Sequence, residues 1–174
     1  MLILLDRDGV LNEGRAGDLK APDALTLLPG AADAVRALNE AGHIVALLAS
    51  PSTGGRGALS AAMLGQIHHV LRAALARSGA RLDHIESGAD MTAPDLIRTV
   101  MARFRKAPSE TVMIGEGLSA LMAAQAAGIA RILIRTGQGA KAQAEGLPPH
   151  ILPVSVYDDL SAAAAALTGR REER

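Results

Sequence analysis

The chain has 174 residues and is 49% apolar, yet its only aromatic residues are Phe104 and Tyr157. A chain of this length can bury a core, which must here be built from aliphatic side chains. The 18 basic and 18 acidic residues cancel, so no charge excess indicates a nucleic-acid partner or a membrane surface. Cysteine is absent, which excludes disulfides, catalytic thiols and thiolate zinc sites within the chain.

Short aliphatic runs in the sequence predict buried strands. They lie at residues 2–5, 43–49, 82–85, 111–115, 131–135 and 150–154. Helical composition and apolar spacing predict helices at residues 30–42, from about 58 onward, and near 94–107, 118–128 and 158–168. In the helix that starts near residue 58, one apolar stripe is predicted, formed by Leu59, Met63, Ile67, Val70 and Ala74.

The alternation of these strands and helices predicts an α/β fold, a Rossmann-like three-layer sandwich with a mostly parallel sheet. Residues 1–168 are expected to form a single domain, followed by a charged tail at 169–174. The apolar run at residues 2–5 is too short for a signal peptide or a membrane span. We therefore expect a cytoplasmic protein without a membrane partner. In such folds ligands bind beyond the carboxyl ends of the strands.

Asp6 and Asp8 stand one residue apart directly after the first strand, in the stretch LDRDGVLN. Carboxylates this close repel each other unless a positive group lies between them, and a divalent cation such as Mg²⁺ prefers oxygen ligands of this kind. With the cation present, one aspartate can attack a phosphate as nucleophile while the other transfers protons. The spacing alone leaves another interpretation open, in which Asp8-Gly9 is an ordinary turn.

The stretch LDRDGVLN resembles the first motif of the haloacid-dehalogenase (HAD) superfamily, in the form carried by histidinol-phosphate and heptose-bisphosphate phosphatases. The resemblance continues through KAPDALTLLPGAADAVRALNEAG, STGGRG, MIGEGLSALMAAQAAGI and RTGQG, and so covers nearly all of the chain. It implies a compact, capless HAD-like domain, Mg²⁺ as cofactor and a small phosphorylated sugar as substrate. Asp6 and Asp8 are then the catalytic residues, and the metal ligands are Asp6, Asp8 and Glu116.

The chain departs from the family pattern after the second strand. Alignment on Arg56 places Ala49 where the family carries a hydroxyl that binds the transferring phosphate. Ser50 comes next, but a shift of one residue on a strand points a side chain to the other face. Ser52 matches a serine of the family, and Arg56 lies in a glycine-rich loop whose amides can hold a phosphate. We therefore expect Ser50, Ser52 and Arg56 to bind substrate; a flexible loop without this role is the alternative.

Further departures concern charged positions. Met91 stands where the family has a lysine, and Lys106, the nearest lysine, lies in a turn that looks like surface. Glu116 replaces the usual metal-binding aspartate and Ala120 replaces a second aspartate. The cysteine-rich zinc loop of heptose-bisphosphate phosphatases is missing, so no zinc is expected.

Two functions remain open on the sequence alone. One is a Mg²⁺-dependent sugar-phosphate phosphatase of the heptose-bisphosphate type, weakened by Ala49, Met91 and Glu116. The other is an inactive pseudo-phosphatase that binds a metal, a sugar phosphate or a protein partner. The retained Asp6 and Asp8 favour a working cation site in either case.

Overall fold

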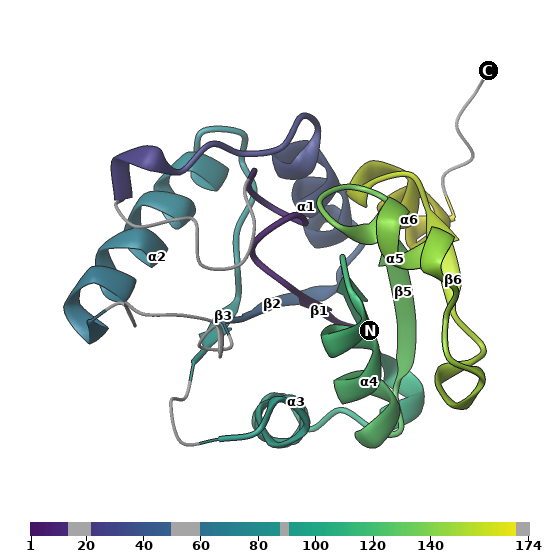
Figure 1. Ribbon diagram of the computed structural model, residues 1–174. Coiled ribbons are helices and arrows are strands. Elements are labelled where there is room, and N and C mark those ends of the chain that lie inside the picture. The colour runs from purple at the N-terminus through teal and green to yellow at the C-terminus, as the bar shows by residue number, and fades with distance from the viewer. Residues whose placement is uncertain (14–21, 50–59, 88–90, 170–174) are drawn as a thin grey trace.

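The computed structural model describes residues 1–13, 22–49, 60–87 and 91–169. Within them the chain forms a six-stranded parallel sheet in the order β3-β2-β1-β4-β5-β6 (Figure 1). The strands are β1 Leu2–Leu5, β2 Ile44–Leu48, β3 His84–Glu86, β4 Thr111–Gly115, β5 Ala130–Ile134 and β6 Ser155–Tyr157. All adjacent pairs are parallel, so the carboxyl ends of the strands meet at one edge of the sheet.

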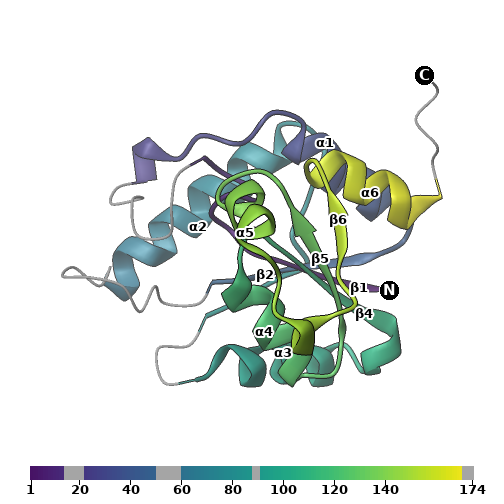
Figure 2. The same cartoon turned by 45° about the vertical axis from the view of Figure 1, so that its right-hand side comes forward.

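Helices cover both faces of this sheet, as the two ribbon views show (Figures 1 and 2). One face packs against α1 Ala31–Glu40, α2 Ala61–Ala76 and α6 Leu160–Thr168, and the other packs against α3 Ala93–Arg103 and α4 Leu118–Ala126. A short helix, α5 Gly139–Glu145, follows β5. Three 3-10 turns complete the described elements, η1 Pro22–Ala24, η2 Pro108–Glu110 and η3 Pro149–Ile151. The α/β, Rossmann-like three-layer architecture predicted from the sequence is confirmed.

The central strand β1 holds the two layers together. All four of its side chains are fully buried. Ile3 and Leu5 pack with α1, α2 and α6, whereas Leu2 and Leu4 pack with α3 and α4. This alternation follows from the period of two along a strand, and burial on both faces explains why the run is continuously apolar. The strand therefore ends at a fixed place in the core, which fixes the position of Asp6.

The structure departs from the sequence-based prediction at α2. The helix begins at Ala61 after Ser60, whose hydroxyl accepts a hydrogen bond from the Met63 N–H at 3.2 Å, as an N-cap does. Its buried residues are Ile67, Leu71 and Leu75. Of the predicted stripe, Ile67 is buried, whereas Met63, Val70 and Ala74 are only half-buried, and Leu59 lies outside the described residues. Residues four apart lie on the same side of a helix. Leu71 and Leu75 accordingly belong to the same core cluster as the buried apolar residues of α1.

The last strand was also misplaced. A strand was predicted at residues 150–154, but η3 occupies Pro149–Ile151 and β6 runs over Ser155–Tyr157. Pro149 and Pro153 lack the N–H that a ladder needs, so pairing begins only after them. The helix α5 was missed because its sequence GAKAQAE carries no apolar stripe. Among the described residues, no helix is long and apolar enough to cross a membrane.

Candidate functional site

Two acidic side chains meet where the central strands end. Asp6 directly follows β1, and Glu116 directly follows the neighbouring strand β4. The Asp6 N–H donates to the carbonyl of Ile114 at 3.1 Å, so the ladder continues one residue past the strand. Gly115 lies so close to Asp6 that a Cβ added to this glycine would sit 2.9 Å from the Asp6 Oδ2 atom. Asp6 and Glu116 thus follow neighbouring strands at the same edge of the sheet.

The electrostatics of the pair are unfavourable when both groups are charged. Burial raises the pKa of Asp6 to about 7, and the negative charges of Glu116 and then Asp8 add to the shift. Burial also raises the pKa of Glu116; a hydrogen bond from the Gln138 N–H opposes this, and the charge of Asp8 supports it. Every influence on Asp6 thus acts against its charged form. A cation placed between the two carboxylates would relieve this repulsion.

Glycines make room for the longer side chain of Glu116. A Cβ added to Gly9 would sit 1.9 Å from the Glu116 Oε2 atom, and one added to Gly137 would sit 1.6 Å from it. The same Oε2 atom accepts a hydrogen bond from the Gln138 N–H at 2.7 Å. The Thr136 hydroxyl donates to the Gly9 carbonyl at 2.6 Å. The segments that follow β1, β4 and β5 are therefore tied together around one carboxylate.

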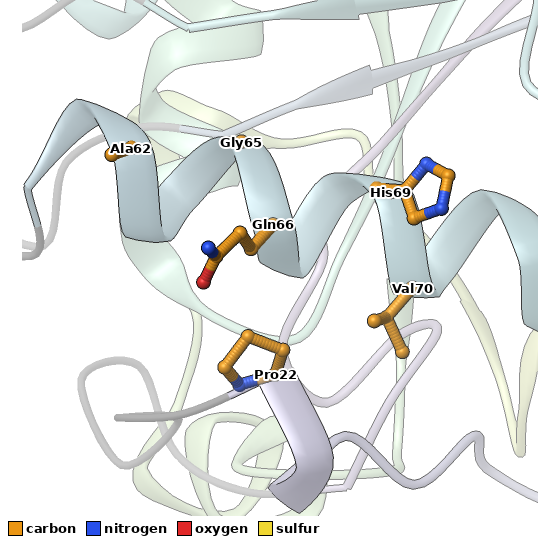
Figure 3. A pocket seen from close by; sticks show the side chains of 6 residues that line it. All are labelled: Pro22, Ala62, Gly65, Gln66, His69 and Val70. Atoms are coloured by element: carbon orange, nitrogen blue, oxygen red, sulfur yellow. The ribbon is translucent and has the colours of Figure 1, made fainter.

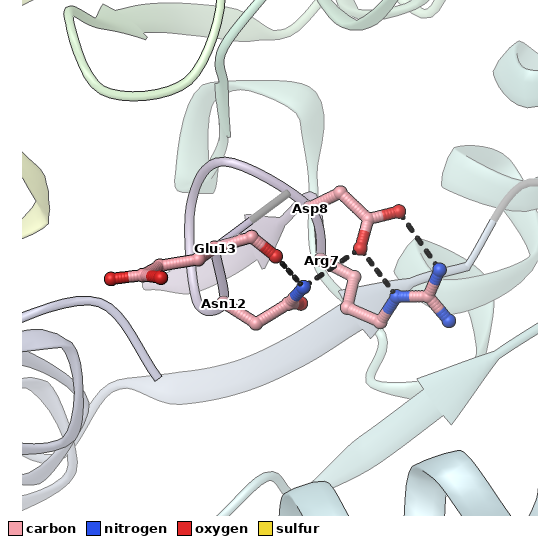
Figure 4. A network of polar contacts seen from close by, with 4 residues as sticks. All are labelled: Arg7, Asp8, Asn12 and Glu13. Atoms are coloured by element: carbon pink, nitrogen blue, oxygen red, sulfur yellow. Dashed lines mark hydrogen bonds and ion pairs between the residues drawn. The ribbon is translucent and has the colours of Figure 1, made fainter. Parts of the chain in front are cut away.

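Asp8 has different neighbours from Asp6. The Arg7 guanidinium donates from Nε to Asp8 Oδ1 at 3.0 Å and from Nη2 to Asp8 Oδ2 at 2.8 Å. The Asn12 amide nitrogen donates to Asp8 Oδ1 at 2.9 Å, as Figure 4 shows. The side chains of Arg7 and Asp8 are each 11% exposed, so water competes little with this pair. The carboxylate of Asp8 is thus engaged by two neighbours from its own loop.

These residues bear on whether the site suits a divalent cation. Within the described part of the chain, no three His, Asp or Glu side chains gather closely enough to hold a metal ion. The predicted ligands Asp6, Asp8 and Glu116 are therefore not gathered around one point as the side chains lie, although the charges of Glu116 and Asp8 both act on Asp6. Mg²⁺ commonly uses one or two carboxylates and keeps several waters and a phosphate as its other ligands. Carboxylates such as Asp6 and Glu116 are donors that such an ion takes, and the roles of Asp6, Asp8 and Glu116 as its ligands stay predictions.

The other predicted positions lie as follows. Ala49 directly follows β2, is buried, and its N–H donates to the Glu86 carbonyl at 2.9 Å. Met91 is 37% exposed and precedes α3. Lys106 lies in the turn after α3, as predicted. Its side chain pairs with Glu110 at 3.0 Å. The predicted substrate-binding residues lie outside the described residues; these are Ser50, Ser52 and Arg56.

The two neighbouring histidines of α2, His68 and His69, differ in exposure. His69 is exposed, but His68 is half-buried and its Nε2 atom has no hydrogen-bond partner within the described structure. Burial lowers the pKa of His68, and the positive charges of Arg7 and then Arg72 lower it further. The positive charge of Arg7, in the loop after β1, therefore acts on His68 of α2.

One described pocket lies away from the carboxylates. It has a volume of about 510 Å³ and lies between η1 and α2 (Figure 3), lined by Pro22, Ala62, Gly65, Gln66, His69 and Val70. Its lining is largely apolar and includes no acidic side chain. With one imidazole and no carboxylate, such a surface offers little to Mg²⁺, which prefers oxygen ligands, or to a phosphate. The candidate site is therefore the strand edge with Asp6 and Glu116.

Arg7, Asn12 and Gly137 contribute to this site but were not predicted as functional residues. Arg7 and Asn12 are present in LDRDGVLN, yet a sequence gives no indication of which side chains turn toward Asp8. A stronger signal existed for Gly137. The stretch RTGQG follows a predicted strand, and glycines near a strand end often mark a close approach of the backbone to another group.

The fit of Glu116 against Gly137 can be tested with a matched pair of glycines. Gly137 and Gly128 both have positive φ, at 58° and 72°. A Cβ on Gly128 would meet no described atom within 4 Å. We expect Gly137→Ala to lower the free energy of unfolding by at least about 1 kcal/mol more than Gly128→Ala, because it also overpacks Glu116. Urea denaturation measures both values; equal losses would contradict the proposed packing.

The raised pKa of Asp6 predicts how stability depends on pH without metal. The native state keeps the proton up to about pH 7, whereas the unfolded chain releases it near the ordinary value of 3.8. The native state then binds more protons between these values, so stability falls as the pH rises through this range. Asp6→Asn should remove most of this fall and raise the melting temperature near pH 8 by several degrees. Thermal unfolding in a chelator, from about pH 5 to about pH 8, measures it; parallel curves for the two proteins would refute the effect.

Comparison with known proteins places this geometry in a family. A family model described as haloacid dehalogenase-like hydrolase matches residues 5–128. A D-glycero-beta-D-manno-heptose-1,7-bisphosphate 7-phosphatase of Pseudomonas putida is 31% identical, and the match covers 95% of this chain and 98% of that protein. Its counterpart from Bordetella bronchiseptica is 34% identical, with 95% and 97% covered.

Solved structures give the same result. A crystal structure of D,D-heptose 1,7-bisphosphate phosphatase from B. bronchiseptica, complexed with magnesium and phosphate, superposes with a TM-score of 0.85 at 34% identity, covering 98% of this chain and 99% of that one. The corresponding enzyme from Burkholderia thailandensis gives 0.77 at 34% identity, with 95% and 97% covered. The chain belongs to the haloacid dehalogenase-like hydrolases and, within them, to the heptose-bisphosphate phosphatase type.

Proposed function

We propose that the protein is a Mg²⁺-dependent phosphatase that hydrolyses a phosphate monoester of a small sugar through an aspartyl-phosphate on Asp6. The observation that carries this proposal is the enclosed carboxyl of Asp6 beside Glu116 at the carboxyl edge of the sheet. Ligands of such sheets bind at this edge. The relatives and solved structures named above, which match nearly the whole chain, support the same reaction.

A heptose 1,7-bisphosphate is the substrate class that we infer. The names of the relatives describe 7-phosphatases of this sugar, and identity of 31% and 34% extends over 95% of the present chain. A doubly phosphorylated sugar also suits a strand edge where backbone amides and loops can hold a second phosphate. The predicted substrate contacts are Ser50, Ser52 and Arg56, from the segment between β2 and α2.

The roles of the two aspartates differ in this proposal. Asp6 attacks the phosphorus, which requires its charged form, although its pKa of about 7 leaves about half of it protonated near neutral pH. Mg²⁺ bound between Asp6 and Glu116 would favour the charged form and neutralise the transferring phosphate. Asp8 gives a proton to the departing sugar oxygen and later takes one from the attacking water. The two residues thus supply covalent catalysis and proton transfer within one loop.

Three replaced positions lead us to propose slow turnover. Ala49 brings no hydroxyl to the phosphate, and an oxyanion donor is worth roughly 10²-fold or more. Met91 brings no positive charge, which on a transferring phosphoryl group is worth about 10³-fold or more. Glu116 carries its carboxylate one methylene farther from the backbone than an aspartate does. These losses do not simply add.

A second candidate function is supported by the same replacements. An inactive protein that binds a metal, a sugar phosphate or a protein partner needs Asp6 and Glu116 as a cation site but needs no phosphate-binding hydroxyl or lysine. The buried Ala49 and the half-exposed Met91 are compatible with it. The two candidates differ in one measurable property, which is turnover that depends on Asp6.

Phosphate release from a panel of sugar phosphates, with and without Mg²⁺, tests the proposal. We expect activity with Mg²⁺ that Asp6→Asn abolishes, at least about 10³-fold below an ordinary enzyme rate near 10 s⁻¹. The triple variant Ala49→Thr, Met91→Lys, Glu116→Asp should be faster by about 10²-fold or more, because it restores groups that contact phosphate and metal. Absence of any turnover that depends on Asp6, in both proteins, would favour the inactive binding protein instead.

A further inference from the structure

In each hydrogen bond that the described residues make with the Asp8 carboxylate, Asp8 is the acceptor. Arg7 donates two of them, from Nε at 3.0 Å and from Nη2 at 2.8 Å, and Asn12 donates the third at 2.9 Å (Figure 4). A carboxylate accepts hydrogen bonds through both oxygens, whereas a protonated carboxyl group must donate one. The contacts of Asp8 therefore fit a carboxylate whose two oxygens both accept. A general base must likewise accept a proton.

The orientation of the Asn12 amide follows from its partners. The Asn12 Nδ2 atom lies 2.9 Å from Asp8 Oδ1 and 2.7 Å from the carbonyl oxygen of Glu13. Both partners are acceptors, so the nitrogen of the amide, rather than its oxygen, must face them. Asn12 is fully buried, and its Oδ1 atom has no hydrogen-bond partner in the described structure. Its side chain is thus held in place for donation to Asp8.

The backbone of the same loop holds the two donors on either side of Asp8. The Arg7 carbonyl accepts from the N–H groups of Leu11 at 2.9 Å and Asn12 at 3.2 Å, and the Gly9 N–H donates to the Asn12 carbonyl at 2.9 Å. Asp8 and Asn12 also form an isolated β-bridge. Arg7 and Asn12 are therefore brought to Asp8 by a turn that closes on itself. The orientation of the carboxylate is built into residues 7–12.

We propose that Arg7, with Asn12, positions the carboxylate of Asp8 to take the proton from water when the aspartyl-phosphate on Asp6 is broken down. This inference rests on the proposed function. In that step the water oxygen forms a bond to phosphorus, the bond between phosphorus and the Asp6 oxygen breaks, and the water proton passes to Asp8. Asp6 regains its carboxylate and inorganic phosphate leaves. Arg7 is a positioning residue, because it acts on this step through Asp8.

Asp8 also gives a proton to the departing sugar oxygen, so the breakdown step is isolated with p-nitrophenyl phosphate, whose leaving group departs without one. A fault confined to breakdown then has a recognisable kinetic signature. The ratio kcat/KM depends on the steps up to formation of the intermediate, whereas kcat also depends on its breakdown. Slower breakdown therefore lowers kcat and KM together and leaves kcat/KM nearly unchanged. It also lets the aspartyl-phosphate accumulate. A general loss of folded protein lowers kcat and kcat/KM equally and produces no accumulation.

The experiment compares Arg7→Gln, Arg7→Lys and the wild type in the full chain with Mg²⁺ and p-nitrophenyl phosphate. We expect Arg7→Gln to lower kcat by about 10²-fold, the lower limit for loss of a positioned proton-transfer group. Its kcat/KM should change by less than about threefold, and acid quench should trap more phosphorylated protein. The kcat of Arg7→Lys should lie between those of Arg7→Gln and the wild type, because an ammonium cannot bond both carboxylate oxygens in the planar geometry of a guanidinium.

Arg36→Gln is the matched control, since Arg36 forms an exposed pair with Asp33 on α1. It should leave both constants unchanged. Equal falls of kcat and kcat/KM in Arg7→Gln, or no fall at all, would overturn the proposal. Failure of the proposed function is distinguishable, because the wild type itself would then show no turnover that depends on Asp6.

A thermal-unfolding cycle with Arg7→Gln, Asp8→Asn and the double variant supplies a readout that needs no turnover. If Arg7 holds Asp8, the loss of stability in the double variant should be smaller than the sum of the two single losses. Strictly additive losses would show that Arg7 does not hold Asp8, and would overturn the proposal even in an inactive protein.

Discussion

The repulsion between two carboxylates at the end of the central strands is the constraint on which the site depends. Asp6 and Glu116 are brought together because β1 and β4 are neighbours in a parallel sheet, and each residue directly follows its strand. The strand β1 is fully buried on both faces, so Asp6 cannot move away without unpacking the core. Burial is the main cause that raises the pKa of both groups, and the charge of Glu116 adds to the conflict at Asp6. A divalent cation is the simplest partner that resolves it.

The three neighbouring carboxylates have different environments. Glu116 sits against Gly9 and Gly137 and accepts a hydrogen bond from the Gln138 N–H, which offsets part of its burial. Asp8 is neutralised locally by Arg7 and receives a further hydrogen bond from Asn12. Asp6 has no such offset among the influences on its pKa. Environments that differ in this way are how one site gives similar acids different tasks.

Much of this arrangement could be predicted from the sequence. Continuous apolar runs such as residues 2–5 identify buried parallel strands. Because ligands bind beyond the carboxyl ends of such strands, Asp6 and Glu116 are expected at the site. The partners of Asp8 could not be predicted, because they depend on how the turn at residues 7–12 folds back. The stripe of α2 was misplaced because an alanine-rich helix has several apolar sides, and tertiary packing selects the one with Leu71 and Leu75. The half-buried His68 follows from the same rotation of the helix.

The central claim is that Asp6 and Glu116 hold the cation. Calorimetric titration with Mg²⁺ near neutral pH tests it directly, since both binding and the release of protons are measured. The account predicts that the wild type binds Mg²⁺ and releases protons, because the cation displaces the proton of Asp6, whose pKa is raised to about 7. Asp6→Asn and Glu116→Gln should each lose binding. Unchanged binding in either variant, or none in the wild type, would contradict the account.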